Sequence, residues 1–251
     1  MTANLLILGG TLEATALCAR LAQLRLHATL SLAGRVARPK RQPLPLRVGG
    51  FGGESGLTRY LKSEAITHVI DATHPFAAQM SRNAIAACAE ADVPLVALTR
   101  APWQAQDGDR WTHVHDMAGA VAALDRPRAR VLLAVGRMHL AEFTPNPQHH
   151  YVLRLIDPPE TPLPFPDCTV TIDRGPFTTR GDTALMKDHR IDLVVSKNSG
   201  GSGAVSKITA ARSLGLPVIM IDRPDMPPRN EVHDTDAALS WLASHGIDLG
   251  V

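Results

Sequence analysis

The sequence has few of the features that mark disulfide-rich, metal-binding or membrane proteins. Its three cysteines, Cys18, Cys88 and Cys168, are far apart and form no Cys-x-x-Cys pair, so we expect reduced thiols. No His-Glu-x-x-His pattern occurs, and we expect no metal. No apolar run approaches the roughly 20 residues that cross a bilayer. The short N-terminal apolar stretch ends at Gly9–Gly10, so we expect a cytoplasmic chain without a signal peptide.

The sequence also has little net charge and lacks several catalytic signatures. The formal net charge of the 251 residues is only +2, which argues against nucleic-acid binding. There is no Walker A loop, so ATP hydrolysis is not expected. Neither Tyr60 nor Tyr151 is followed by lysine four residues later, which excludes the short-chain dehydrogenase mechanism. Arginine outnumbers lysine 21 to 5. This excess reflects either codon usage or a surface that binds carboxylates or phosphates, and composition does not distinguish the two.

Short apolar segments alternate with segments of helical periodicity, which predicts parallel sheets covered by helices on both faces. We expect an α/β fold with two units, residues 1–124 and 125–251, joined somewhere within 101–130. The predicted strands are 4–8, 27–33, 46–48, 68–73, 94–100, 111–115, 130–135, 151–156, 169–173, 192–196 and 217–222, and the predicted helices are 12–24, 54–64, 77–91, 138–143, 178–189, 204–215 and 235–245.

The stretch LLILGGTLEA at 5–14 resembles a dinucleotide-binding turn without matching Gly-x-Gly-x-x-Gly. Gly9 provides the tight turn, and Thr11 stands where the second glycine would be. Gly10 and Thr11 leave main-chain N–H groups free at the helix start, and the Thr11 hydroxyl can bind an anion or cap the helix. Glu13 would repel a phosphate placed too close. The stretch favours nucleotide binding; the alternative is a plain strand-to-helix turn.

The end of the second predicted strand lacks the acidic residue that NAD-specific sites use for the ribose hydroxyls. Ser31 and Arg35 are present instead, and Arg38, Lys40 and Arg41 follow. A hydroxyl and guanidinium groups favour the 2′-phosphate of NADPH. A solvated basic loop remains the alternative.

Two further loops follow predicted strands and carry polar side chains. In DATHPFAAQMSRNA (71–84), His74 directly follows a strand at the carboxyl edge of the sheet, where it is either a general acid, a substrate clamp or a structural residue. In VVSKNSGGSGAVSK (194–207), Lys197, Asn198 and Ser199 offer donors, and Gly200 allows close approach of a ligand. This second loop is either an anion or substrate binder or a flexible connector.

Taken together, these segments resemble the precorrin-6A reductase family. The resemblance is carried by GGTLEA (9–14), DATHPF (71–76), RAPW (100–103), DRGPF (173–177), SKNSGG (196–201) and KITAARSLGLPVIMIDRP (207–224), which occur in order over nearly the whole chain. It implies two Rossmann-like domains with mostly parallel sheets and the active site in the cleft between the domains. It also implies NADPH-dependent reduction of a carbon–carbon double bond of precorrin-6A to give precorrin-6B in cobalamin biosynthesis, without metal or flavin.

The resemblance and the residue patterns together define the expected site. His74 is the candidate proton donor. Trp103 either stacks on the flat macrocycle or fills a hydrophobic gap, and no acidic catalyst is expected in 178–183. The expected cofactor ligands are Gly9, Gly10, Thr11, Ser31 and Arg35, and the expected substrate ligands are Thr73, Ser81, Arg100, Trp103, Gly136, Lys197, Asn198, Ser199, Gly200 and Arg223.

Two other functions remain open from the sequence. The chain could be a two-domain NADP(H) sensor without catalysis, or a reductase of another conjugated substrate. If the chain is an enzyme, its expected partners are NADPH and an acidic tetrapyrrole, and it is expected to bind neither nucleic acid nor a membrane. The expected oligomeric state is a monomer.

Overall fold

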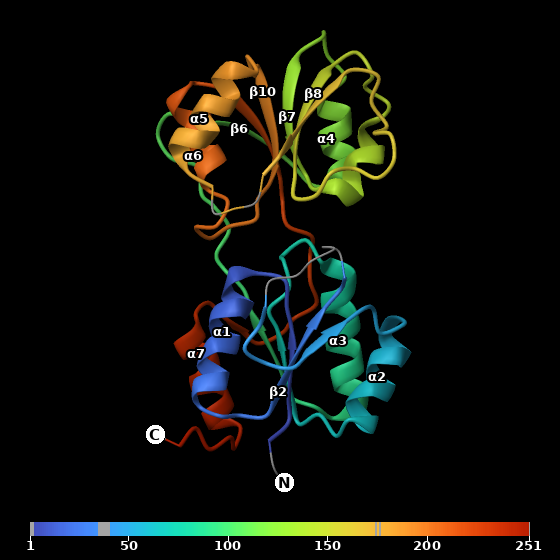
Figure 1. Cartoon of the computed structure of the whole chain (residues 1–251), viewed down its shortest axis with the longest axis vertical. Coiled ribbons are helices and arrows are strands. Elements are labelled where there is room, and N and C mark those ends of the chain that lie inside the picture. The colour runs from blue at the N-terminus through green and yellow to red at the C-terminus, as the bar shows by residue number, and fades with distance from the viewer. Residues whose placement is uncertain (1–2, 35–40, 174, 176, 251) are drawn as a thin grey trace. The chain divides into compact units, whose positions relative to one another are not determined.

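The computed structural model describes residues 3–34, 41–173, 175 and 177–250. Strands and helices alternate along the chain, and it forms two compact units (Figure 1). The first unit consists of residues 1–101 and 225–251, and the second consists of residues 102–224.

The first unit contains a six-stranded parallel sheet in the order β3-β2-β1-β4-β5-β12. From the middle of the sheet, the chain proceeds outwards from β1 to β3 on one side and from β4 to β12 on the other. Its elements are β1 (Leu5–Leu8), α1 (Leu12–Gln23), β2 (Ala28–Leu32), β3 (Leu46–Val48), α2 (Gly53–Ser63), β4 (His68–Asp71), α3 (Ala78–Ala91), β5 (Leu95–Leu98), β12 (Glu231–Val232) and α7 (Thr235–Ser244).

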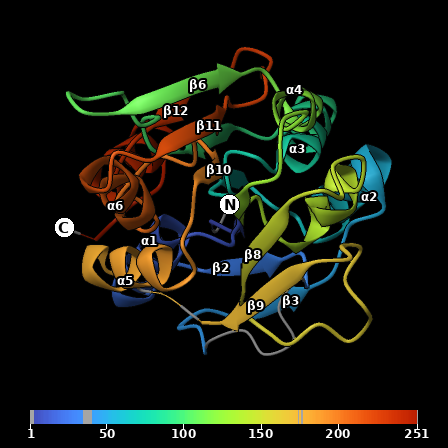
Figure 2. The ribbon, with the colours of Figure 1, turned by 90° about the horizontal axis from the view of Figure 1, so that it is seen from above.

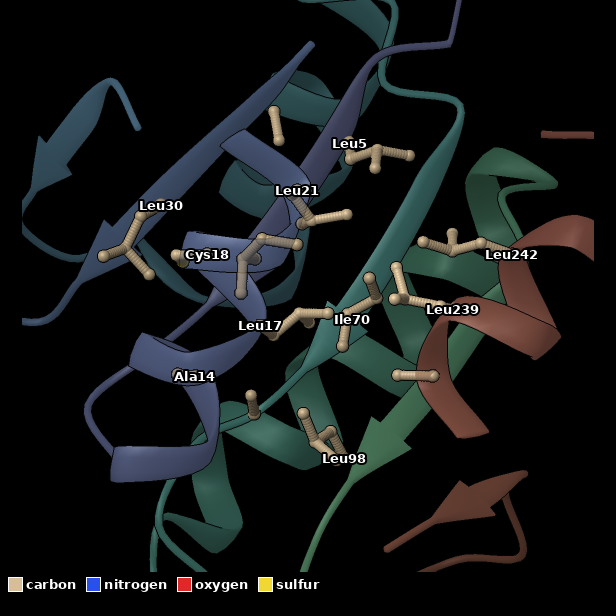
Figure 3. Packing of buried hydrophobic residues seen from close by; sticks show 14 of the residues in the cluster. Leu5, Ala14, Leu17, Cys18, Leu21, Leu30, Ile70, Leu98, Leu239 and Leu242 are labelled. Carbon is tan, nitrogen blue, oxygen red and sulfur yellow. The ribbon is translucent and has the colours of Figure 1, made fainter. Parts of the chain in front are cut away.

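Strand alternation gives the first sheet two buried faces. Leu5 and Ile7 of β1 point to the face covered by α1 and α7, whereas Leu6 and Leu8 point to the face covered by α2 and α3. Figure 3 shows the first of these clusters, in which side chains of α7 meet those of α1 and the strands. The labelled residues are Leu5, Ala14, Leu17, Cys18, Leu21, Leu30, Ile70, Leu98, Leu239 and Leu242. The C-terminal helix therefore completes the core of the N-terminal unit.

The second unit has the same kind of sheet, in the order β9-β8-β7-β10-β11-β6, and all neighbouring strands are parallel. Figure 2 labels β9, β8, β10, β11 and β6 of this sheet. Helices α5 and α6 cover one face around a cluster that includes Met186, Val194 and Ile208, and α4 packs against β11, β6 and η1. Its elements are β6 (Arg110–Val114), α4 (Met117–Ala123), β7 (Arg130–Ala134), the 3₁₀ helix η1 (Arg137–Phe143), β8 (His150–Leu155), β9 (Cys168–Ile172), α5 (Thr179–Asp188), β10 (Leu193–Lys197), α6 (Ser206–Ser213) and β11 (Pro217–Ile221).

The division of the chain differs from the predicted 1–124 and 125–251. Residues 102–124 belong to the second unit, because β6 pairs with β11 at the edge of that sheet. Residues 225–251 belong to the first unit, because β12 pairs with β5 and α7 packs on the first core. Two elements, α4 and β12, were not predicted, and the segment predicted as a short helix at 138–143 is a 3₁₀ helix.

Within the described ranges, no helix has the length and apolar character needed to cross a membrane. The same residues contain no group of three or more histidine, cysteine, aspartate or glutamate side chains arranged to hold a metal ion.

Candidate active site

The strand orders of the two sheets identify where a ligand would bind in each unit. In open parallel sheets, ligands bind at the carboxyl ends of the strands, where the chain changes its direction of winding. That point lies between β1 and β4 in the first unit and between β7 and β10 in the second. The predicted segments 9–11 and 73–74 follow β1 and β4, and Gly136 and the segment 197–200 lie at the ends of β7 and β10.

The turn between β1 and α1 favours glycine at both of its glycine positions. A Cβ on Gly9 would lie 2.4 Å from Cδ1 of Leu30, and Gly10 has a φ of +126°, which favours glycine. The Thr11 hydroxyl caps α1, since it accepts from the N–H of Ala14 at 3.1 Å and donates to the carbonyl of Ala72 at 2.8 Å. An anion here would therefore bind to the main-chain N–H groups of the first helical turn, which have no acceptor within the helix.

Arg100 offsets the negative charge in this turn. Its Nη1 lies 2.6 Å from Oε2 of Glu13, and the two side chains are only 15% and 24% exposed. Glu13 would otherwise repel a phosphate at the start of α1. The predicted substrate ligand Arg100 thus has a structural partner in the turn, and its charge makes the turn more suitable for an anion.

Ser31, a predicted cofactor ligand, is buried at the end of β2 next to an arginine that the sequence analysis did not select. Arg47 of β3 is the register partner of Ser31, and its Nη1 donates to Oγ of Ser31 at 3.3 Å. The same guanidinium donates to the carbonyls of Gly49 and Gly50 and lies 3.8 Å from the ring centroid of Phe51. The other predicted ligand here, Arg35, lies outside the described residues.

A buried carboxylate organises the loop that follows β4. Oδ1 of Asp71 accepts from the N–H and hydroxyl of Thr73, at 3.1 and 2.7 Å, and Oδ2 accepts from Ser81 at 2.5 Å. Arg229, from the segment that returns before β12, lies 3.2 Å from Oδ2. The predicted substrate ligands Thr73 and Ser81 therefore hold the shape of this loop through Asp71.

The same loop holds His74, the candidate proton donor, in a defined orientation. Its Nδ1 accepts the main-chain N–H of Phe76 at 3.2 Å, and the two rings are 5.9 Å apart. Because Nδ1 acts as an acceptor, a neutral imidazole here carries its proton on Nε2. His74 is thus suited to donate a hydrogen bond through Nε2.

In the second unit, Trp103 and Asn198 lock the loop after β10. The Asn198 amide accepts from the N–H of Trp103 at 2.8 Å and donates to the carbonyl of Trp103 at 3.0 Å. The indole N–H of Trp103 donates to the carbonyl of Gly201, and Nζ of Lys207 lies 5.0 Å from the ring centroid. Trp103 also packs against the hydrophobic cluster on this face, as in the gap-filling alternative.

The remaining predicted residues of this unit surround the same loop. Arg223 donates through Nε to the carbonyl of Asn198 and through Nη2 to that of Ser199, each at 3.1 Å. Gly200 has a φ of +67°, and Gly136, two residues after the end of β7, has a φ of +85°. Lys197 is the last residue of β10. The structure therefore brings these predicted ligands to one edge of the second sheet, as it does for the other described ligands in the first unit.

The stretch 178–183, where no acidic catalyst was expected, contains a buried aspartate. Asp182 is 1% exposed, pairs with Arg154 of β8 and accepts from the Ser206 hydroxyl at 2.5 Å. The Arg154 guanidinium lies 3.6 Å from the ring centroid of Phe177. These contacts give Asp182 a structural role between β8, α5 and α6.

A family model described as precorrin-6x reductase CbiJ/CobK matches residues 4–243. The chain belongs to this family. A precorrin-6A reductase from Rhodobacter capsulatus is 59% identical over 243 residues, which are 97% of both chains. One from Sinorhizobium is 46% identical over 96% of this chain and 94% of its own. A cobalt-precorrin-6A reductase from Priestia megaterium is 31% identical over 88% of this chain and 90% of its own.

A solved structure of the family supports the architecture. A CobK precorrin-6A reductase structure superposes with a TM-score of 0.94, is 58% identical in sequence and covers 97% of both chains. The predicted α/β fold with two units built on parallel sheets is thereby confirmed.

Three residues that shape the site were not predicted as functional. Arg47 is the middle residue of a three-residue strand that follows a run rich in arginine and proline, and this context indicated no ligand. Arg229 reaches Asp71 over a separation of 158 residues, and no local pattern indicates such a contact. Lys207 is buried and donates to the carbonyl of Ala204, although lysine at the start of a helix is usually exposed. A signal was present only for Arg47, which lies two residues before the glycine-rich stretch 49–53.

Proposed function

We propose that this chain is an oxidoreductase that reduces a carbon–carbon double bond of precorrin-6A to give precorrin-6B in cobalamin biosynthesis, with NADPH as the reductant. The observation that carries the proposal is family membership over residues 4–243, with 59% identity to a precorrin-6A reductase. The β1–α1 turn adds physical support. It lies at the point in the first sheet where dinucleotides bind in this type of fold.

The first unit has the residues that a nicotinamide dinucleotide requires. Gly9 and Gly10 allow close approach of a diphosphate, and the first-turn N–H groups of α1, oriented by the Thr11 cap, donate to it. Ser31, near the end of β2, and Arg35, which follows it in the sequence, are proposed to bind the adenosine ribose and its 2′-phosphate. When bound, NADPH supplies the hydride.

The loops of both units are proposed to bind the tetrapyrrole. Its acetate and propionate arms are anions, and Lys197 at the end of β10 offers a cation for them. Gly136 and Gly200 let the main chain approach the ligand, while Thr73, Ser81, Arg100, Trp103, Asn198, Ser199 and Arg223 keep the loops in shape. His74 is proposed to donate a hydrogen bond through Nε2 to the ring that receives the hydride.

The relatives favour the cobalt-free substrate. The two relatives with 59% and 46% identity are named precorrin-6A reductases, whereas the relative with 31% identity is named for cobalt-precorrin-6A. We therefore propose metal-free precorrin-6A.

Stopped-flow absorbance tests this function. The purified chain is mixed with NADPH and metal-free precorrin-6A, and the absorbance of NADPH at about 340 nm is followed. We expect one NADPH to be oxidised for each precorrin-6A consumed, with a slower reaction for cobalt-precorrin-6A. A protein that binds NADPH but oxidises none in the presence of precorrin-6A would be a sensor, and the proposal would be wrong.

A further inference from the structure

Arg47 lies beside the place where a dinucleotide fold puts the adenosine ribose. It is the in-register neighbour of Ser31, which is the next-to-last residue of β2. The alternation of side chains puts Ser31 on the face covered by α2, since its register partner in β1 is Leu8. Arg47 extends on this same face, where its guanidinium lies near the rings of Phe51 and Tyr60. In such folds, the group at the end of the second strand selects between a free 2′-hydroxyl and a 2′-phosphate.

The guanidinium of Arg47 is held rigidly by neutral groups. Nη1 donates to Oγ of Ser31 at 3.3 Å and to the carbonyl of Gly49 at 2.5 Å, and Nη2 donates to the carbonyl of Gly50 at 2.8 Å. The face of Phe51, 3.8 Å away, supports the plane of the group. Three of the five N–H groups of an arginine are used in this way. The Nε hydrogen and the second Nη2 hydrogen remain for another acceptor.

Arg47 differs in its charge balance from four other partly buried arginines. Each of these four has a carboxylate within 3.2 Å: Arg100 pairs with Glu13, Arg154 with Asp182, Arg212 with Asp109 and Arg229 with Asp71. No acidic side chain in the described part of the chain forms an ion pair with Arg47. A partly buried cation without a counter-ion is costly, and an anionic ligand group can supply the missing charge.

We propose that Arg47 determines the preference for NADPH over NADH by binding the 2′-phosphate, with Ser31 and the Gly49–Gly50 carbonyls fixing the guanidinium in position. The inference rests on the proposed use of a nicotinamide dinucleotide in the first unit. It adds a specificity-determining residue from β3 to the ligands expected after β2. Planar guanidinium groups bind phosphate through two parallel hydrogen bonds, which fits the two N–H groups that remain.

Two small nucleotides isolate the contact from catalysis. Adenosine 2′,5′-bisphosphate (2′,5′-ADP) carries the 2′-phosphate and 5′-AMP lacks it. Isothermal titration calorimetry on the full chain measures the Kd of each, and their ratio reports the 2′-phosphate alone. In Arg47→Met, whose side chain keeps an apolar stem over Phe51, we expect the Kd of 2′,5′-ADP to rise roughly 10- to 100-fold, as for loss of a charged hydrogen bond. The Kd of 5′-AMP should change by less than about threefold on the same scale.

A matched control and a conservative variant accompany this test. Arg20→Met removes the same charge from the same unit, but at the opposite end of α1, where Arg20 is exposed and 3.6 Å from Asp236. It should leave both Kd values unchanged. Arg47→Lys keeps the charge without the planar fork, so we expect an intermediate loss confined to 2′,5′-ADP.

The structural alternative is that Arg47 only stabilises the glycine loop. In that case both nucleotides weaken equally, or neither does, and the proposal is overturned. If neither variant folds, phenylglyoxal labelling of the wild-type chain, read by peptide mass spectrometry, gives the answer: 2′,5′-ADP protects Arg47 and 5′-AMP does not. Equal protection by both nucleotides also overturns it. If the wild-type chain binds 2′,5′-ADP no more tightly than 5′-AMP, the proposed use of NADPH is itself refuted. That result differs from the one that overturns only the role of Arg47.

Discussion

His74 can be assigned a chemical role from one contact. The N–H of Phe76 points at Nδ1, so an imidazolium that gave up its Nε2 proton would keep its other proton on Nδ1, against this donor. A proton-transfer role is therefore disfavoured, and a hydrogen-bond donor that stays neutral through the reaction fits the loop. The sequence indicated His74 by its place after a strand, but the direction of its two nitrogens depends on the turn that follows.

A pair of substitutions distinguishes these roles. His74→Ala should lower kcat about 100-fold, the typical cost of one donor at a developing charge, with the Kd for NADPH unchanged. His74→Gln can place an amide oxygen and an N–H in similar directions, so we expect it to recover much of the loss. Steady-state kinetics and NADPH titration provide the measurements. Full activity of His74→Ala would remove the role, and no recovery in His74→Gln would favour proton transfer.

Other predicted residues proved to be paired within their own unit. Thr11, Thr73 and Ser81 were selected because hydroxyls bind anions, yet each hydroxyl has a main-chain or carboxylate partner. Residue type and position in a loop were sufficient to find these residues. The partner of Thr11 could not be predicted, because the pairing of β1 with β4 brings the carbonyl of Ala72 to its hydroxyl.

At the scale of elements, most strands and helices were predictable and their ends were nearly correct. Apolar runs with a period of two or about 3.6 are set by burial, and the turn residues that separate them are local. The exceptions have physical causes. Helix α4 is only seven residues long and contains Gly119, and β12 has two residues, so neither shows a periodic pattern. The first turn of α4 is instead stabilised by the cap from Asp116.

The contact between β4 and α7 depends on a buried histidine. His68 begins β4, is 7% exposed and lies against Trp241 and His245 of the C-terminal helix and its cap. Its Nε2 is 3.2 Å from the carbonyl of His245, which can only accept a hydrogen bond. Burial lowers the pKa of His68 below its ordinary value of about 6.5. The folded chain therefore holds this imidazole in its neutral form.

This shift predicts a loss of stability in mild acid. The unfolded chain binds the proton more tightly, so the contribution of His68 is complete above about pH 6.5 and is lost as pH falls through the lower folded-state pKa. Urea unfolding between pH 7.5 and 5 should show a decreasing free energy of unfolding. His68→Gln should reduce this slope by up to about 1.4 kcal/mol per pH unit, the limit for one proton. Substituting the exposed His27 with Gln should not. An unchanged slope in His68→Gln would contradict the assignment.

At the scale of the whole chain, the sequence predicted two α/β units but misplaced the boundary. Contiguous domains are the natural expectation from a linear alternation of strands and helices. The first sheet, however, ends in β12, which follows the whole of the second unit, and the second sheet ends in β6, which lies before the predicted boundary. The edge of a sheet accepts any strand with compatible backbone direction, so local composition does not specify which sheet a terminal strand joins.

The central claim about the molecule is that the main-chain N–H groups at the start of α1 bind the diphosphate of NADPH. A crystal structure of the full chain with NADP⁺ tests it most directly. We predict diphosphate oxygens about 3 Å from the first-turn N–H groups at Leu12 and Glu13. Diphosphate bound elsewhere, such as at Gly136 or Gly200 of the second unit, would contradict this account.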